Sequence, residues 1–257
     1  MPAAKEPLPL ILKHHPKFIF FTDFDGTITN QDSNDFLINN FGHGPLRRKE
    51  VFDDILHERR TFRDGFKELL DGIQLPLYKC IAELLENITL DEGFKEFYAW
   101  THEHNIPVIV LSGGMNPIIR ALLAHLIGED EVKTLPVLSS NVVARSGKNL
   151  DEEGGWEIAY RDDSSYGHDK SLQIQPYAAL PDGQRPTLFY AGDGVSDLSA
   201  ARETDLLFAK EGRDLVTYCQ KENVPFTTFR DFSQILGIMK RIVSGDVSVK
   251  DVADGKA

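Results

Sequence analysis

Residues 18–29, FIFFTDFDGTIT, constrain the fold of this chain more than any other stretch. The apolar run at its start is rich in β-formers and predicts a buried strand, which is followed by a sharp turn at Gly26. Asp23 and Asp25 would then lie at the carboxyl end of that strand, where open α/β sheets place their ligands. Two carboxylates this close repel each other and favour a site with a compensating cation or proton. Asp and Gly are also ordinary turn residues, so the pair alone leaves both interpretations open.

A second apolar run, residues 106–111, leads into a hydroxyl residue and two glycines. The helical pattern that follows is expected to have Asn116 as its N-cap and Pro117 as its first residue. Free backbone N–H groups at a helix N-terminus bind anions, and they would lie beside Ser112 and Gly113. Taken alone, however, the sequence SGG is more typical of a plain strand-to-helix turn.

Residues 187–191 form a third strand pattern, which ends in the acidic, glycine-rich turn GDGVSD with Asp193 and Asp197. A fourth strand pattern spans residues 206–209, and helical patterns alternate with the strands, which predicts a parallel sheet. The carboxyl ends of these strands would bring two aspartate pairs and a hydroxyl to one edge. Clustered carboxylates without histidine or cysteine suit a hard cation, and Mg²⁺ fits best because it keeps waters and is completed by substrate phosphate.

Residues 33–89 contain four helical patterns and no strand pattern. They predict a small helical cap inserted into an α/β core, which is formed by residues 17–32 and 90–244. Residues 136–160 contain two short β-like runs separated by SGKNLDEEGG, and these runs predict a β-hairpin flap over the site. The predicted fold is therefore a parallel α/β core with an inserted helical cap and a hairpin flap.

Composition narrows the class of protein. In the 257 residues, 28 lysines and arginines against 40 aspartates and glutamates give a net charge of −12, which argues against nucleic acid or an anionic membrane as the main partner. Cys80 and Cys219 are expected to be buried free thiols in a reducing compartment. No apolar run approaches the ~20 residues of a membrane span. The termini, 1–16 and 245–257, are predicted to be flexible, with the first a leader and not a secretion signal, so a cytoplasmic location is expected.

The motifs resemble those of the haloacid dehalogenase superfamily, most of whose members are phosphatases. DFDGTIT is similar to the first motif, Ser112 to the second, Lys170 in YGHDKSLQIQ to the third, and GDGVSD to the fourth, in the expected order. Within the superfamily the chain resembles the phosphoserine phosphatase group. GFKEFYAWTHEHNIPVIVLSGGM and GVSDLSAARETDLLFAK are similar to bacterial methionine-salvage phosphatases, and the whole chain resembles uncharacterised fungal phosphatases. The resemblance implies a Rossmann-like core under a helical cap.

The same resemblance implies a Mg²⁺-dependent phosphomonoesterase that acts on a small phosphorylated metabolite. Asp23 would attack phosphorus and form an aspartyl-phosphate, while Asp25 would act as general acid and base. Asp23, the backbone carbonyl of Asp25, and Asp193 would hold the metal, with Asp197 in support. The groups implied to bind the phosphoryl oxygens are Ser112, Gly113 and Lys170.

Two departures from phosphoserine phosphatases concern the substrate. Those enzymes have a glutamate nine residues after the nucleophile, where this chain has Asp32, which is therefore a candidate for substrate binding. Their cap arginine, which clamps the substrate carboxylate, falls on Leu69 in an ungapped alignment. The substitutes that stand nearby are Arg60, Arg63 and Lys67. Phosphoserine is consequently not the preferred substrate.

Other functions remain open at this point. Dehalogenases lack the second aspartate of the pair, so Asp25 argues against that reaction. A phosphotransferase could use the same aspartyl-phosphate and pass the phosphoryl group to an alcohol. A phospho-acceptor signalling domain or a non-catalytic phospholigand-binding module is the non-enzymatic alternative, although the five key residues of the motifs are all present.

Overall fold

A computed structural model describes residues 15–253, so most of the predicted N-terminal leader lies outside the described residues. In the described part, seven strands form one sheet in the order β4-β3-β2-β1-β5-β6-β7. The central strand β1 (Phe18–Thr22) pairs in parallel with β2 (Val108–Met115) and with β5 (Thr187–Gly192). Beyond β5, the strands β6 (Leu206–Lys210) and β7 (Thr227–Phe229) continue the parallel order. The predicted α/β class is confirmed.

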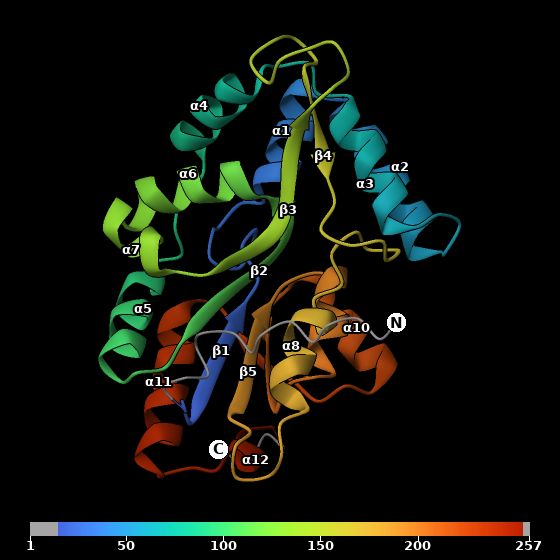
Figure 1. The fold of residues 1–257 in the computed structure, drawn as a ribbon. Coiled ribbons are helices and arrows are strands. Elements are labelled where there is room, and N and C mark those ends of the chain that lie inside the picture. The colour runs from blue at the N-terminus through green and yellow to red at the C-terminus, as the bar shows by residue number, and fades with distance from the viewer. Residues whose placement is uncertain (1–14, 254–257) are drawn as a thin grey trace, which may run out of the picture.

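Helices cover both faces of the sheet, which explains the unbroken apolar run of β1 (Figure 1). Phe20 faces α5 (Phe94–Glu103) and α11 (Phe232–Ser244), where it packs among aromatic rings that include Phe97 and Phe232. Phe21 belongs to the cluster on the opposite face, which α8 (Ser171–Ala178) and α10 (Asp214–Glu222) cover. Because alternate residues point to opposite faces, a strand buried on both sides is apolar at every position.

The predicted helical cap is a group of four helices at the carboxyl end of the sheet (Figure 1). The described residues between β1 and α5 contain no strand, in agreement with the sequence pattern. Asp32 is the N-cap of the first helix, since its Oδ1 accepts a hydrogen bond of 2.8 Å from the backbone N–H of Asp35. The four cap helices are α1 (Ser33–Phe41), α2 (Gly44–Leu56), α3 (Phe62–Asp71) and α4 (Leu77–Asn87).

The cap enters and leaves the core through two adjacent chain segments that are bonded to each other. Thr29 and Leu90 form an isolated antiparallel bridge. The backbone N–H of Asn30 donates to the Thr89 carbonyl at 2.9 Å, and the Gln31 side chain accepts from the Thr89 N–H at 2.8 Å. The cap is therefore connected to the core at the side of the sheet where Asp25 and α1 lie.

The predicted hairpin is also part of the core sheet. The first half of β3 (Val137–Ala144) pairs in parallel with β2, and its second half pairs with the antiparallel β4 (Trp156–Ala159). The hairpin rises from the sheet to the cap helices (Figure 1), where Arg145 forms a 2.7 Å ion pair with Asp71. The Trp156 indole N–H donates to the Leu75 carbonyl at 2.8 Å. These bonds attach the hairpin to the cap, so it is not a free-standing flap.

Other parts of the fold differ from the sequence prediction. β3, β4 and β7 extend the sheet beyond the four predicted strands. Part of the C-terminal segment predicted to be flexible forms α12 (Val249–Ala253), because Val252 is buried and its carbonyl accepts a 3.2 Å hydrogen bond from Thr227 Oγ1. Cys80 and Cys219 are buried free thiols, as predicted. None of the described helices has the length and apolar character that crossing a membrane requires. The remaining elements are α6 (Asn116–Ile127), α7 (Glu129–Thr134), a 3₁₀ turn (Val195–Asp197) and α9 (Leu198–Ala201).

Candidate active site

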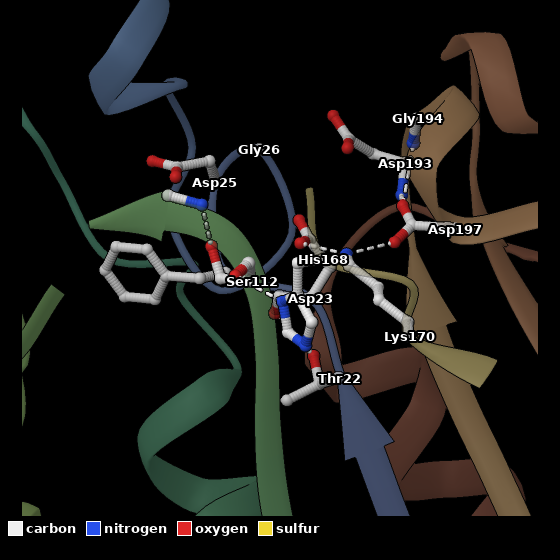
Figure 2. Close-up of polar contacts among 12 residues, drawn as sticks. Thr22, Asp23, Asp25, Gly26, Ser112, His168, Lys170, Asp193, Gly194 and Asp197 are labelled. Atoms are coloured by element: carbon white, nitrogen blue, oxygen red, sulfur yellow. Dashed lines mark hydrogen bonds and ion pairs between the residues drawn. The ribbon is translucent and has the colours of Figure 1, made fainter. Parts of the chain in front are cut away.

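Asp23 lies directly after the central strand, in the position that the sequence predicts. Its backbone N–H donates to the Ala191 carbonyl of β5 at 2.8 Å, which continues the sheet ladder by one residue. The carboxylate is buried, and its Oδ1 lies 2.6 Å from Lys170 Nζ (Figure 2). The first and third motifs therefore meet in the folded chain.

Lys170 is a fully buried cation at the centre of the site. Besides Asp23, its Nζ contacts Asp197 Oδ1 at 2.5 Å and donates to Tyr190 Oη at 3.0 Å. Burial disfavours the ammonium, but Asp197 and Asp23 outweigh it and raise the pKa of Lys170 above its usual range. The lysine is thus charged at neutral pH, and it directly precedes the first residue of α8.

The Asp197 carboxylate organises the turn of the fourth motif. Its Oδ2 accepts hydrogen bonds of 2.9 Å from the backbone N–H groups of both Asp193 and Gly194. Its Oδ1 pairs with Lys170 and accepts a 2.5 Å hydrogen bond from the Tyr190 hydroxyl. Because Oδ2 binds the turn and Oδ1 binds Lys170, Asp197 holds the turn and the lysine in fixed positions relative to each other.

Asp23, Asp193 and Asp197 form an acidic cluster in which one carboxylate oxygen of each lies within 4.8 Å of the others; Asp23 and Asp197 are buried, and Asp193 is half-buried. Burial raises the pKa of Asp23 to about 7, although Lys170 opposes the shift. Burial, followed by repulsion from Asp23 and Asp197, raises the pKa of Asp193 well above its usual range. Three carboxyl groups share one ammonium, so their full ionisation requires a further cation, and their oxygen-only donor set is the kind that Mg²⁺ prefers.

Gly26 makes the close approach of Asp193 to the first motif possible. Its φ of +74° lies in the left-handed region, and a Cβ at this position would lie 2.2 Å from Asp193 Oδ2. Any other residue would therefore strain the turn and displace the aspartate.

Asp25 belongs to a different part of the site. Its Oδ1 accepts a 2.8 Å hydrogen bond from the Ser33 N–H, and its Oδ2 accepts one of 2.9 Å from the Asn34 side chain. The first turn of α1 thus holds this carboxylate, which points away from Asp193 (Figure 2). Burial raises the pKa of Asp25 and, to a level well above the usual range, that of Asp32.

The second motif lies inside β2, because this strand continues to Met115, beyond its predicted end. As a result α6 begins at Asn116 itself, and Met115 takes the N-cap position that was predicted for Asn116. Ser112 Oγ accepts a 3.0 Å hydrogen bond from the Gly114 N–H. Figure 2 shows Ser112 on the opposite side of Asp23 from Lys170.

Comparison with known proteins identifies the family. A model of the haloacid dehalogenase-like hydrolases matches residues 20–202. The chain belongs to this family. Polyol phosphate phosphatase PYP1 of Saccharomyces cerevisiae is 46% identical to this hydrolase over 244 residues, which cover 93% of the chain and 99% of the relative. The 2-hydroxy-3-keto-5-methylthiopentenyl-1-phosphate phosphatase of Bacillus mycoides is 28% identical over 224 residues, with 87% and 96% covered.

The fold of the hydrolase is similar to that of a phospho-aspartyl intermediate analogue of phosphoserine phosphatase. The TM-score is 0.63 at 18% identity, over 87% of this chain and 98% of the other. Family membership and the phosphatases among its relatives make this chain a phosphoric monoester hydrolase, as the sequence predicted. This result excludes the non-enzymatic alternative that the sequence left open, a signalling domain or a phospholigand-binding module.

The cap of this hydrolase does not present the carboxylate clamp that the sequence left open. Arg60 Nη1 pairs with Glu68 at 2.7 Å, and Arg63 Nη1 donates to the Asp162 carbonyl at 2.5 Å. Lys67 pairs with Asp71 at 3.0 Å and with Glu157 at 3.1 Å. Leu69, at the aligned position, is fully buried. Arg60 is thus paired inside the cap, Arg63 binds the loop that follows the hairpin, and Lys67 joins the cap to the hairpin.

Three side chains of the site were missed by the sequence analysis. Tyr190 carries a polar tip in an otherwise apolar strand that ends at the fourth motif, and this could have indicated its role. His168 stands two residues before Lys170 and approaches the Ser112 carbonyl. Asn34 follows the helix start at Asp32, and no feature of the sequence signals its contact with Asp25.

Proposed function

We propose that this hydrolase is a Mg²⁺-dependent phosphatase of small polyol phosphates that works through an aspartyl-phosphate on Asp23. The observation that carries the proposal is the buried cluster around Lys170. In it, a carboxylate at the strand end lies against a charged ammonium and beside a second aspartate, Asp193. This arrangement provides a nucleophile, a cation for the phosphoryl oxygens and oxygen ligands for a metal in one place.

The proposed roles follow from the contacts. Asp23 attacks phosphorus, and Lys170, the Ser112 hydroxyl and the Gly113 N–H hold the phosphoryl oxygens as charge develops on them. Asp23, Asp193 and the backbone carbonyl of Asp25 would hold Mg²⁺, which supplies further positive charge when bound. Asp197 keeps Lys170 and the fourth-motif turn in position through the hydrogen bonds described above.

Asp25 is suited to proton transfer. In this proposal it donates a proton to the leaving alcohol and then accepts one from the water that hydrolyses the aspartyl-phosphate. Burial raises its pKa, so a larger fraction of the carboxyl is protonated near neutral pH. Its two hydrogen bonds to the first turn of α1 orient it away from the acidic cluster.

The substrate class rests on the cap and on the relatives. Because Arg60, Arg63 and Lys67 are each engaged in other contacts, a substrate carboxylate would be desolvated without gaining a partner from them. A polyol phosphate carries hydroxyl groups in place of the carboxylate and avoids this cost. The relative at 46% identity is named for that substrate class. Asp32 is proposed to face the substrate while it caps α1. The predicted cytoplasmic location stays a prediction.

The test is a comparison of kcat/KM for glycerol 3-phosphate, a longer polyol phosphate and phosphoserine, each in the presence of Mg²⁺. The polyol phosphates should be preferred by about 10- to 100-fold, which corresponds to about 1–3 kcal/mol for an unpaired polar group. A preference for phosphoserine would refute the substrate class. Released phosphate should equal released alcohol; a deficit of phosphate in the presence of added glycerol would indicate phosphotransfer in place of hydrolysis.

A further inference from the structure

His168 is a buried side chain of the site that the proposed mechanism does not use. It is 2% exposed, and its Nδ1 lies 2.7 Å from the Ser112 carbonyl oxygen. Because a carbonyl oxygen can only accept, Nδ1 carries the hydrogen. Burial lowers the pKa of His168 to about 4, so the ring is neutral at pH 7. Nε2 has no hydrogen-bond partner among the residues that the structure describes, so the contact with Ser112 is the one polar contact of the ring there.

The pairing of β2 with β3 is interrupted in the segment that this contact reaches. β2 pairs with β3 at Ser112 and Ser139, and the next pair is Met115 with Ser140. The two glycines between these pairs lie outside the regular ladder. A Cβ on Gly113 would meet no atom within 4 Å, so side-chain packing does not confine this residue either. Since glycine has the most mobile backbone, the residues proposed to bind the phosphoryl oxygens need another anchor.

We propose that His168 is a positioning residue that fixes Ser112 and Gly113 relative to Lys170. The three-residue segment from His168 to Lys170 bonds to the Ser112 carbonyl at one end and to Asp23 and Asp197 at the other (Figure 2). It thereby sets the width of the space in which the phosphoryl group would lie. The inference rests on the proposed function in one respect, namely that Ser112 and Gly113 bind the phosphoryl oxygens.

The loop before His168 is itself firmly held. Asp162 Oδ1 accepts a 2.9 Å hydrogen bond from the Ser164 N–H, and Asp162 Oδ2 accepts one of 2.8 Å from the Asp169 N–H. The Asp162 N–H donates to the Gly167 carbonyl at 3.0 Å. Arg63 of the cap binds the same loop at the Asp162 carbonyl. These bonds hold the loop to itself and to the cap, so His168 follows a segment with several fixed contacts.

The experiment compares two substitutions of the same ring. His168→Asn keeps an N–H donor at the same distance along the side chain as Nδ1, whereas His168→Leu removes it. His104→Leu is the matched control, since His104 Nδ1 makes a similar 2.9 Å contact with the Trp100 carbonyl at an exposed position. For each folded variant, kcat and KM are measured with p-nitrophenyl phosphate, together with inhibition by orthovanadate and by inorganic phosphate.

His168→Leu should lower kcat/KM by about 10- to 100-fold, since a misplacement of ~1 Å can cost about 100-fold. It should weaken orthovanadate, which mimics the five-coordinate phosphoryl group, more than it weakens phosphate. His168→Asn should restore most of both losses, and His104→Leu should change neither. An unchanged ratio of the two inhibition constants in His168→Leu, or no recovery in His168→Asn, would overturn the positioning role.

Ser112→Ala separates this inference from the proposed function. If Ser112→Ala leaves kcat/KM unchanged, the proposed phosphate site fails and the positioning role fails with it. If Ser112→Ala lowers kcat/KM and His168→Leu does not, the positioning role alone fails. If His168→Leu does not fold, His168→Gln takes its place in the comparison. The glutamine amide lies one bond further from the backbone than the asparagine amide, so its N–H is displaced from the position of Nδ1. Equal activity of the Asn and Gln variants then overturns the inference, and a defect confined to Gln supports it.

Discussion

Replacing Lys170 with methionine tests the electrostatic basis of the site. The substitution keeps a long apolar side chain but removes the ammonium that lies 2.6 Å from Asp23 Oδ1 and 2.5 Å from Asp197 Oδ1. Both carboxylates remain buried, so each loses the charge that compensates for its removal from water. We expect a loss of stability and a loss of activity, for separate reasons.

The size of each loss follows from burial. Removing one partner of a buried ion pair costs about 3–5 kcal/mol, and in a chain of this size each kcal/mol lowers Tm by about 2–4 °C. The expected decrease in Tm is therefore about 6–20 °C. Because Lys170 is also proposed to balance charge on the phosphoryl oxygens, kcat should fall by about 100- to 1,000-fold.

Thermal unfolding of the metal-free protein and hydrolysis of p-nitrophenyl phosphate measure the two effects. Lys67→Met is the matched control, since Lys67 also contacts two carboxylates, Asp71 at 3.0 Å and Glu157 at 3.1 Å, but its side chain is 41% exposed. That change should cost at most about 1 kcal/mol. Adding Asp197→Asn to the Lys170 variant should recover part of the stability without recovering activity. Equal decreases in Tm for the two lysine variants would refute the reasoning.

Three other changes test the remaining parts of the site. Asp23→Asn should abolish phosphate release and keep the fold, because the amide is nearly isosteric but a poor nucleophile; substantial activity with an unchanged circular dichroism spectrum would contradict the covalent mechanism. EDTA should silence the enzyme and Mg²⁺ should restore it, whereas restoration by Zn²⁺ alone would contradict the oxygen-ligand argument. The pKa of His168 falls from 6.5 to about 4 on folding, so the unfolded chain binds more protons between these values and stability is lost as pH falls through this window. The free energy of unfolding should fall by up to about 3 kcal/mol from this cause. Measured by urea unfolding between pH 7 and pH 4, it should fall less steeply for His168→Asn than for the natural chain. The same dependence on pH in both proteins would show that His168 does not cause the loss.

The strands that carry the site could be predicted because their patterns are local. A strand buried on both faces must be apolar throughout, and the chain must turn where polar residues and Gly26 follow it. In a parallel sheet the carboxyl ends of the strands share one edge, so Asp23 and Asp193 are expected at that edge. Residues 33–89 could likewise be assigned to a cap, since their helical periodicity is uninterrupted by strand patterns.

The errors lie where tertiary contacts override local pattern. The hairpin strands have ordinary β-like sequences, and their amino-acid order does not indicate that β3 also joins the core sheet or that Arg145 binds the cap. The C-terminal segment is polar and local reasoning predicts disorder, yet Val252 finds a buried position. From the sequence alone, Arg63 is a candidate for binding a substrate. Only the folded structure shows that it donates to the Asp162 carbonyl instead.

The sequence by itself determined the fold class and the places of the aspartates at the strand ends, because strand pattern and turn chemistry act over a few residues, and its motifs indicated the family. Lys170 was found through its resemblance to a family motif, since a lysine in a polar stretch carries no sign of burial. Its contact with Asp23 joins positions 147 residues apart, and that of His168 with Ser112 joins positions 56 apart. Such partners share no local pattern. Only the packed chain, in which burial makes an unpaired charge or donor costly, decides which of them meet.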